Sequence, residues 1–569
     1  MKTNYGRLGQ EALFALNSSS KQAESVQTRL LTGLLRRNQD TEYGKKYGFG
    51  EIKNPLEYQK MAPLSVYADY EGYIRRMIDG ENGLLTKEPA IYYCISSGTT
   101  GEAKYLPLTE TDLRLQYIYA YGVPFGMARN YYKGLCEEEV FGDIFQIGEF
   151  AKTSMENGVM NGIRSGCVYQ WLDRDGEFDA GDYCVPKEVL FPKKLEDLLY
   201  VKARFALARR SIRAIHGVFI NRVAGVMDYI WRNWETLLFD MEHGSVDSGV
   251  CISQKWREFV TEKLPPNPAR AKELRLLSYE RLKCGMVKKI WPNARYILAI
   301  GGRAFSYYTK KMETYAGDVP IYHYAYAASE GIFGVAERMG RADAYILFPQ
   351  AGFFEFLPLL NENEKEKEKE EETEKEQGRP LFLWELRLGG RYELIFTNHS
   401  GLYRYCMGDV VQVVGWYEKA PVVRFCYRKN QIMNIAGEKS NQEQLAEAIR
   451  QFSVRMNCEI TGYCVREDVS DVLPGYLFYL ECQKPLDCPL AYAQEVLDEC
   501  LCGVNYEYLG CRRMKEIKEA RICYLMAGSF GRYEQYLEKI GRQTGQNKQV
   551  CILNTKEKIQ FFDRHRLDG

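Results

Sequence analysis

Residues 96–101 form a short polar segment, Ser-Ser-Gly-Thr-Thr-Gly, directly after an apolar run over residues 90–95. Hydroxyls and backbone N–H groups in a glycine-containing loop can wrap an anion, because glycine tolerates the angles that turn successive N–H groups inward. Lys104 adds a positive charge three residues later. The spacing is not that of a Walker P-loop, so it does not predict the usual phosphoryl-transfer site. By itself, such a segment after a strand is typical of an ordinary turn.

A second candidate segment, residues 326–331, has the sequence Tyr-Ala-Ala-Ser-Glu-Gly and follows a strand-like run over residues 319–325. The ring of Tyr326 can stack on adenine, and the small residues after it let a nucleotide lie against the chain. Ser329 can donate to a phosphate, and Glu330 can hold Mg²⁺. In isolation, Ser-Glu after a strand is equally typical of a helix cap.

Two further residues are candidates for ligand contacts. Gly301 lies at the end of a predicted strand over residues 291–302, where a glycine permits close approach of a ligand to the backbone. An ordinary turn has the same pattern. Asp409 stands at the entrance of a strand-like run over residues 410–414. One carboxylate can accept from two adjacent hydroxyls, such as those of ribose, although Gly-Asp at this place is often only a turn.

The order of these segments resembles that of the acyl-adenylate-forming superfamily, which contains acyl-CoA synthetases, luciferases and amino-acid-adenylating domains. Residues 97–104 are similar to its phosphate loop, residues 326–330 to its second fingerprint, and residues 405–409 (Tyr-x-x-Gly-Asp) to its ribose motif. The flanking strings at residues 38–49 and 58–67 resemble one branch, the auxin-responsive acyl-acid amido synthetases of the Gretchen Hagen three family.

The resemblance implies ATP and Mg²⁺ as cofactors, with Glu330 as the metal ligand. The expected nucleotide-binding residues are Ser96, Ser97, Gly98, Thr99, Thr100, Lys104, Gly301, Tyr326, Ser329, Glu330, Asp409 and Arg428. The expected catalytic residues are Lys548, Glu330 and Thr99. In relatives, the lysine matched by Lys548 neutralises charge on the α-phosphate. The string around Lys548 fits the family pattern only in part, and the alternative for Lys548 is an ordinary surface lysine. The alternative for Arg428 is a surface salt bridge.

The implied fold is α/β. A large N-terminal adenylate-forming domain, residues 1–430, has mixed sheets, a distorted barrel and flanking helices, and it binds ATP and the acyl acid. A small C-terminal α+β domain, residues 431–569, follows on a hinge and rotates between two half-reactions. Residues 361–377 are almost entirely Glu, Lys and Asn, so we expect a flexible, solvated insert in the large domain.

Local patterns predict three elements that bear on the site. Residues 109–129 predict a helix that follows the polar loop and aims its first N–H groups at a bound phosphate. Residues 195–241 predict a long, mostly helical stretch. In the small domain, residues 506–514 predict a strand.

Composition excludes several classes of protein. The chain has 569 residues, with 76 basic and 76 acidic side chains, so it offers no basic field for nucleic acid or an anionic membrane. No apolar run of about 18 residues predicts a membrane span, and the N-terminus predicts no signal peptide. The 17 cysteines show no C-x-x-C spacing, which favours reduced thiols without a metal. We therefore expect a cytoplasmic monomer whose partners are small molecules only.

The chemistry implied by the resemblance begins with a carboxylate, which is a poor electrophile. Displacing pyrophosphate from ATP makes an acyl-adenylate, which an amine, expected to be an amino acid, then attacks to give an amide and AMP. Two alternatives remain open. The acyl group could pass to coenzyme A or a carrier thiol, or the chain could be a non-catalytic homologue that binds nucleotide or acyl groups.

Overall fold

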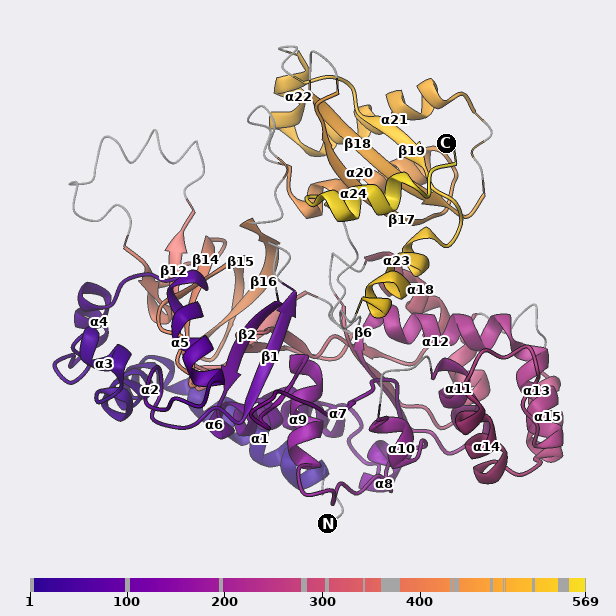
Figure 1. The fold of residues 1–569 in the computed structure, drawn as a ribbon, viewed down its shortest axis with the longest axis horizontal. Coiled ribbons are helices and arrows are strands. Elements are labelled where there is room, and N and C mark those ends of the chain that lie inside the picture. Colours follow the sequence, from indigo (N-terminus) through magenta and orange to yellow (C-terminus); the bar gives the residue numbers. More distant parts are fainter. Residues whose placement is uncertain are drawn as a thin grey trace. The chain divides into compact units, whose positions relative to one another are not determined.

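The computed structural model describes most of the chain in two compact units (Figure 1). The described residues are 5–97, 103–193, 198–277, 284–301, 306–340, 343–359, 379–429, 433, 440–470, 474–484, 486, 488–513, 517–540 and 552–567. The first unit comprises residues 1–407 and 411–425, and the second comprises residues 408–410 and 426–569. The domain boundary after residue 430 stays a prediction, and the predicted insert at residues 361–377 lies outside the described residues.

Three sheets lie in or extend from the first unit. Sheet β2-β1-β5-β4 contains β1 (Tyr92–Ser97), β2 (Ala103–Leu108), β4 (Thr153–Ser154) and β5 (Met160–Gly162). Sheet β13-β12-β14-β15-β16-β11-β10-β9 contains β9 (Ala325–Ala328), β10 (Gly331–Ala336), β11 (Tyr345–Leu347), β12 (Phe353–Pro358), β13 (Leu381–Phe382), β14 (Arg391–Thr397), β15 (Tyr405–Tyr417) and β16 (Ala420–Arg428). Sheet β3-β6-β7-β8 contains β3 (Ile144–Gln146), β6 (Ala214–Phe219), β7 (Tyr296–Ile300) and β8 (Ile321–Tyr322), all parallel.

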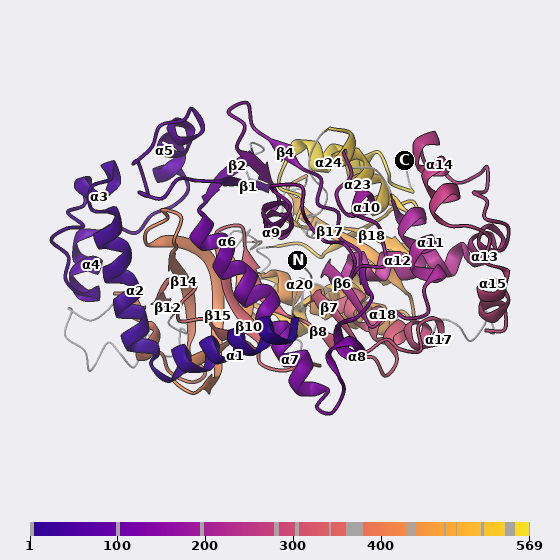
Figure 2. The same ribbon diagram turned by 90° about the horizontal axis from the view of Figure 1, so that it is seen from below.

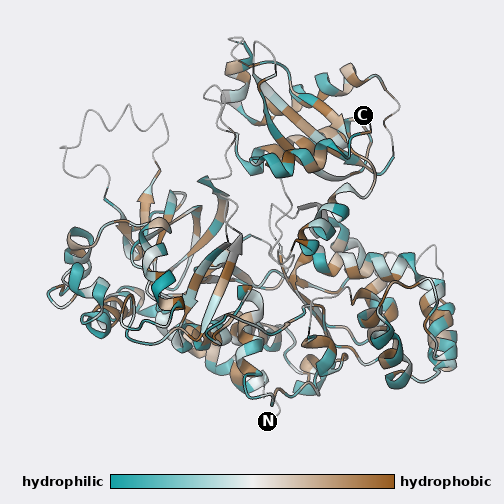
Figure 3. Ribbon diagram, in the orientation of Figure 1, coloured by the Kyte–Doolittle hydropathy of each residue, from teal (hydrophilic) through white to brown (hydrophobic). Residues whose placement is uncertain are grey.

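Helices surround these sheets, with hydrophilic residues on many of their outward faces (Figure 3). They are α1 (Tyr5–Lys21), α2 (Ala23–Asn38), α3 (Glu42–Lys46), α4 (Pro55–Met61), α5 (Ala68–Ile78), α6 (Glu110–Gln116), α7 (Val123–Tyr131), α8 (Glu137–Phe141), α9 (Arg164–Leu172), α10 (Lys187–Leu190), α11 (Leu199–Ala208), α12 (Ile220–Arg232), α13 (Trp234–His243), α14 (Gln254–Lys263), α15 (Pro268–Arg275), α17 (Met286–Ile290), α18 (Ser306–Ala316) and the 3₁₀ helix η3 (Leu383–Glu385). Within the described ranges, no helix has both the length and the apolar character needed to cross a membrane.

A π-helical segment, η1 (Tyr117–Gly122), joins α6 to α7 and makes one helical run of the three. The N-terminal helix α1 packs along the end of this run (Figure 2). Gly9 and Gly126 meet at the crossing, where a Cβ on Gly126 would lie 2.4 Å from the Gly9 carbonyl oxygen. Only residues without a side chain allow the two backbones to approach this closely.

The predicted helix over residues 109–129 is confirmed, but it does not begin directly after the polar loop, because β2 lies between them. Its first N–H groups already have side-chain partners. Thr109 accepts from the N–H of Asp112, and Glu88 accepts from that of Thr111 at 2.8 Å. The expectation that these groups face a bound phosphate is therefore wrong.

The predicted helical stretch over residues 195–241 is wrong at residues 214–219, which form β6. This strand pairs with β3 on one side and β7 on the other, and its first four residues are buried. A parallel strand covered on both faces shows a continuous apolar run rather than alternation, so its period cannot be told from that of a buried helix. One set of side chains of the parallel sheet packs with its helices in a hydrophobic cluster, and the alternate set, which includes Ile144, Ala214 and Tyr296, belongs to the larger cluster around the other two sheets.

The second unit has a three-stranded sheet covered by helices. Its elements are β17 (Ile460–Asp468), β18 (Gly475–Cys482), β19 (Arg521–Tyr524), α20 (Gln442–Arg455), α21 (Leu490–Val504), α22 (Tyr506–Arg513), α23 (Ser529–Lys539) and α24 (Lys556–Asp563). The strand predicted over residues 506–514 is wrong, because this segment is α22. Asn505 accounts for the difference: its Oδ1 accepts from the N–H of Tyr508 at 3.1 Å, the contact of a helix N-cap.

Candidate functional site

The first candidate segment begins at the end of β1, one strand of a β-hairpin. β1 and β2 are antiparallel, with Ser96 opposite Lys104 and Ser97 opposite Ala103. The strand therefore continues through the two serines, which were predicted to belong to the loop. Of Ser96 and Ser97 only the backbone is described, and Gly98, Thr99 and Thr100 lie outside the described residues. Their predicted contacts to phosphate stay predictions.

Lys104 stands on β2 at the base of this hairpin. Its Nζ lies 5.1 Å from the centre of the Tyr67 ring, which is the geometry of a cation–π contact. The Tyr67 hydroxyl accepts from the backbone N–H of Tyr105 at 3.1 Å, which ties the ring to the strand. Lys104 is thus held on the hairpin by an aromatic face, and its role toward a phosphate stays a prediction.

The second candidate segment is also a hairpin turn. β9 and β10 are antiparallel, with Ala328 opposite Gly331, so Ser329 and Glu330 form the two-residue connection. The helix cap that the sequence left open is therefore excluded. Tyr326, on β9, is buried, and its ring lies 5.0 Å from that of Phe333 and 5.9 Å from that of Phe425. Stacking of Tyr326 on adenine stays a prediction.

Cys94, on β1, lies near the turn that carries Ser329. Burial raises the pKa of the Cys94 thiol to about 12, while the charge of Arg164 and the side chain of Ser329 act in the opposite direction. The Ser329 side chain is therefore close to the strand that leads into residues 98–102.

Two side chains hold the turn that carries Ser329 and Glu330. Arg164 Nη1 donates to the carbonyl oxygen of Ser329 at 3.0 Å, and Asn398 Nδ2 donates to that of Glu330 at 3.0 Å. Arg164 is the first residue of α9, and Asn398 directly follows β14. Sequence reasoning missed both residues.

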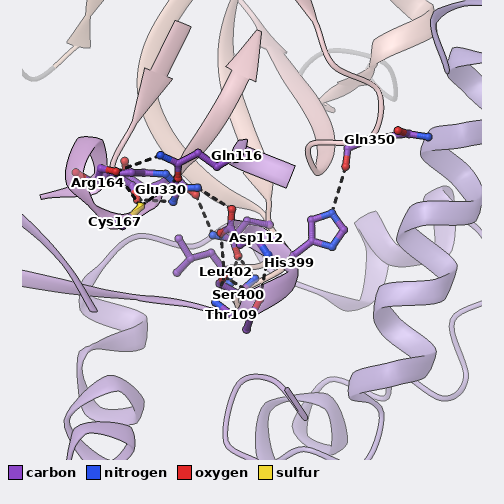
Figure 4. Close-up of polar contacts among 12 residues, drawn as sticks. Thr109, Asp112, Gln116, Arg164, Cys167, Glu330, Gln350, His399, Ser400 and Leu402 are labelled. Carbon is purple, nitrogen blue, oxygen red and sulfur yellow. Dashed lines mark hydrogen bonds and ion pairs between the residues drawn. The ribbon is translucent and has the colours of Figure 1, made fainter. Parts of the chain in front are cut away.

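A buried carboxylate stands behind these donors. Asp112, on α6, accepts from Arg164 Nη2 at 2.6 Å and from the Ser400 hydroxyl at 2.9 Å. Figure 4 shows Asp112 between Arg164 and Ser400, with Glu330 close by. Burial is the largest single influence and lowers the pKa of the Arg164 guanidinium, but Asp112 together with the thiols of Cys167 and Cys94 outweighs it and raises that pKa. The cluster therefore remains an ion pair in the interior.

Gly301 ends β7 against the ring of His323. A Cβ at Gly301 would lie 2.2 Å from His323 Nδ1, so no side chain fits there while the ring keeps its place. Burial lowers the pKa of His323 to about 4, and the imidazole is neutral at physiological pH. The ring explains why residue 301 is glycine, and a ligand contact at Gly301 stays a prediction.

Asp409 and Arg428 meet on neighbouring strands. Arg428 Nε donates to Asp409 Oδ1, and the carboxylate is buried while the guanidinium is partly exposed. Both residues belong to the second unit. The alternative of a salt bridge for Arg428 is therefore realised, although not at the open surface, and the predicted ribose contacts of both residues stay predictions. Lys548 lies outside the described residues.

Models of one family match almost the whole chain. The GH3 family N-terminal domain matches residues 12–321, its central domain residues 345–428, and its C-terminal domain residues 443–557. The chain belongs to the GH3 (Gretchen Hagen three) family, which confirms the resemblance found in the sequence.

Curated relatives extend this assignment along the full length. The chain is 27% identical over 570 residues to the putative indole-3-acetic acid-amido synthetase GH3.9 of Arabidopsis thaliana, covering 96% of this chain and 94% of the relative. It is 27% identical over 598 residues to the jasmonoyl-L-amino acid synthetase GH3.5 of Oryza sativa subsp. japonica, covering 98% and 97%.

Solved structures confirm the fold. The acyl acid amido synthetase AtGH3.15 in complex with 2,4-DB matches with a TM-score of 0.83 and 21% identity, covering 100% of this chain and 98% of that one. A second structure of the GH3.15 acyl acid amido synthetase matches with a TM-score of 0.81 and 21% identity over 98% of this chain and 96% of that one. At this identity the likeness shows the fold alone, and it confirms the predicted α/β class with large and small domains.

Proposed function

We propose that this protein is an ATP-dependent acyl-acid amido synthetase. It activates a small carboxylic acid as an acyl-adenylate, releases pyrophosphate, and transfers the acyl group to an amine with release of AMP. The relatives are named as a putative indole-3-acetic acid-amido synthetase and a jasmonoyl-L-amino acid synthetase, which supports an amino acid as acceptor. The structural observation that best supports the proposal is the pair of hydrogen bonds at the turn of the second motif, from Arg164 Nη1 to the Ser329 carbonyl oxygen and from Asn398 Nδ2 to the Glu330 carbonyl oxygen. Arg164 also pairs with Asp112, on the helix that follows β2, so this turn is linked to the chain that leaves the first motif.

The chain's own residues supply what adenylation demands. Attack of the carboxylate on the α-phosphorus of ATP concentrates negative charge on phosphate oxygens, so the site needs fixed donors and cations rather than a covalent nucleophile. In the second step the amine attacks the acyl carbon of the adenylate, and AMP leaves. We assign phosphate contacts to Ser329, Lys104 and the 96–101 segment, and charge neutralisation to Lys548. Asp409 is assigned to the ribose hydroxyls, where the partner it has in this structure, Arg428, would orient the carboxylate.

Glu330 is the residue assigned to Mg²⁺. Among the described residues, no group of three or more His, Cys, Asp or Glu side chains is arranged to hold a metal ion. One carboxylate at a partly exposed hairpin turn suits Mg²⁺, which usually takes one or two carboxylates and completes its shell with water and substrate phosphates. When bound there, Mg²⁺ would neutralise phosphate charge.

The domains carry separate tasks in this proposal. Residues 1–430 bind ATP and the acyl acid, and residues 431–569 form a mobile domain that brings Lys548 to the adenylation step and then admits the amine. We place the protein in the cytoplasm as a monomer that acts on small molecules, without nucleic acid or membrane partners.

Pyrophosphate exchange tests the proposal. The protein is incubated with ATP, Mg²⁺, labelled pyrophosphate and a library of carboxylic acids, and exchange that depends on one acid class is the expected result. Mass analysis after addition of amino acids or of coenzyme A then identifies the acceptor, with an amide as the expected product. Absence of exchange across the library would favour a non-catalytic homologue, and a thioester would favour the ligase alternative.

A further inference from the structure

The β9–β10 turn is fixed at two consecutive peptide groups. Arg164 Nη1 holds the carbonyl oxygen of Ser329, and Asn398 Nδ2 holds that of Glu330, each at 3.0 Å. Because the Cα–Cβ bond has a fixed geometry relative to the backbone, holding both carbonyls restricts the directions in which the side chains of Ser329 and Glu330 leave the turn. A turn of two residues has few other contacts that could orient these two side chains.

The two donors are joined behind the turn. Asp112 accepts from Arg164 Nη2 at 2.6 Å and from the hydroxyl of Ser400 at 2.9 Å. Asn398 Oδ1 accepts from the backbone N–H groups of Ser400 and Leu402, each at 2.9 Å. The same Ser400 hydroxyl accepts from the N–H of Thr109 at 3.0 Å, at the end of the β1–β2 hairpin. One network thus links the residues that follow β2 to the turn between β9 and β10 (Figure 4).

Burial makes this network costly, so its role depends on what it holds in place. Arg164 is 4% exposed, Asp112 6%, Asn398 3% and Ser400 0%. Removing such charges from water costs about as much as their attraction returns, and apolar side chains of similar volume often give a more stable protein. The fork of an arginine shared between one carboxylate and one carbonyl nevertheless defines a single geometry.

We infer that Arg164, Asp112, Asn398 and Ser400, here called the Arg164 network, are positioning residues for adenylation. They aim the Ser329 hydroxyl and the Glu330 carboxylate at the phosphates and at Mg²⁺, and they touch neither substrate nor metal themselves. The inference rests on the proposed function, because it assigns the support of that same site.

Arg164→Lys and Asn398→Ala test the two ends of the network. Lysine keeps a positive charge beside Asp112 but has no planar fork to reach the Ser329 carbonyl as well. Alanine removes the donor to Glu330. Arg204→Lys is the matched control, because Arg204 is also buried, with its Nη1 donating to the carbonyl oxygen of Ser245 at 2.8 Å, and it contacts no predicted site residue. Pyrophosphate exchange is measured against ATP and Mg²⁺ concentration, and thermal unfolding is recorded for all three.

Both network variants are expected to raise the KM for ATP and the half-saturating Mg²⁺ concentration by about tenfold, which corresponds to about 1.4 kcal/mol. Excess Mg²⁺ should restore much of the rate of Asn398→Ala, because Glu330 itself is retained. Arg204→Lys should stay within about twofold in both constants while its Tm falls as far as that of Arg164→Lys.

Each outcome tests either the inference or the proposed function on which it rests. Exchange by the wild-type protein with unchanged ATP and Mg²⁺ constants in both network variants would overturn the inference alone. Equal changes in Arg164→Lys and Arg204→Lys would also overturn it, since they would reflect general destabilisation. No exchange by the wild-type protein would instead remove the proposed function on which the inference rests.

Discussion

Two buried arginines of the first unit show how similar chemistry serves different purposes. Arg164 pairs with Asp112 at 2.6 Å and holds the carbonyl of Ser329. Arg204, on α11, donates to the carbonyl oxygens of Ser245 and of Asp240 on α13 at 2.8 and 3.0 Å. Each guanidinium therefore lies beside a buried aspartate and donates to a backbone carbonyl oxygen.

The difference lies in what the held backbone carries. The Arg204 network (Arg204, Asp240, Tyr200 and Ser245) ties two helices inside the cluster around the parallel sheet, and none of its members is a predicted site residue. The Arg164 network holds a turn of two residues, both with side chains assigned to ATP or Mg²⁺. A buried arginine is therefore no marker of a site by itself, and the residues at the far end of its contacts decide its role.

Removing the buried aspartates should lower the unfolding free energy most, and by a similar amount in the two networks. Asp112→Ala and Asp240→Ala each leave a buried guanidinium without its carboxylate, which costs about 3–5 kcal/mol of unfolding free energy. Urea unfolding followed by tryptophan fluorescence measures the change, and Asp112→Asn and Asp240→Asn serve if the alanine variants do not fold. A loss below about 1 kcal/mol in one network would show that its ion pair is not needed for burial.

A double-mutant cycle should separate the two networks in catalysis. Arg164→Lys and Asn398→Ala act on adjacent carbonyls of one turn, so their effects on kcat/KM of exchange should couple by about 0.5–3 kcal/mol. Arg204→Lys combined with Asn398→Ala provides the control, where we expect additive effects. Additivity in both cycles would mean that the turn is not held as a unit.

The fall in unfolding free energy at alkaline pH should distinguish the Cys94 thiol from the Tyr200 hydroxyl. Burial raises the pKa of Cys94 from 9.0 to about 12, so the unfolded chain loses its thiol proton first, and the stabilisation by neutral burial is lost between pH 9 and pH 12. The loss reaches about 1.4 kcal/mol at pH 10.

Burial also raises the pKa of Tyr200, but from 10.0, so its own loss begins about one pH unit higher. Cys94→Ala should therefore reduce the fall in unfolding free energy between pH 8 and pH 10 more than Tyr200→Phe does. Urea unfolding at the two pH values measures the difference, and an unchanged fall in Cys94→Ala would mean that the thiol ionises in the folded protein.

The two serines that donate to the aspartates should give the smallest effects. The hydroxyls of Ser400 and Ser245 each lie 2.9 Å from a carboxylate oxygen, of Asp112 and Asp240 respectively. Ser400→Ala and Ser245→Ala should each cost about 1 kcal/mol of stability. Only Ser400→Ala should also lower kcat/KM of exchange, by about fivefold. Equal losses of activity in both would contradict the assigned difference between the networks.

The sequence predicted the segments of the site better than the elements around them. The strings at residues 96–101 and 326–331 carry their chemistry in consecutive residues, so they can be predicted without a structure. Ser96 and Ser97 end β1, and Ser329 and Glu330 form the β9–β10 connection. The element types failed where burial hides periodicity. β6 is covered on both faces, and α22 depends on the side chain of Asn505 as its cap.

The support of the site could not have been predicted. Arg164 and Asp112 are 52 residues apart, and Ser400 lies 288 residues from Asp112. Nothing in the local string of any of them indicates burial, and arginine and aspartate are mostly exposed in folded proteins. The sequence pattern that comes nearest to predicting this network is Asn-x-Ser directly after β14, but that pattern is also typical of an ordinary turn.

The π-helical segment η1 has a consequence for the evolution of this chain. The helical run keeps Asp112 and Gln116 toward the interior before η1 and presents Gly126 to α1 after it. A π-helical turn holds one residue more than an α-helical turn, so deleting one residue from 117–122 would restore ordinary α-helical winding and leave the segments on either side facing as before. Deleting one residue elsewhere in the run would instead rotate everything beyond it by about 100° around the axis and turn Gly126 away from α1. A single-residue deletion should therefore be tolerated better within this short stretch than in the α-helical parts of the run.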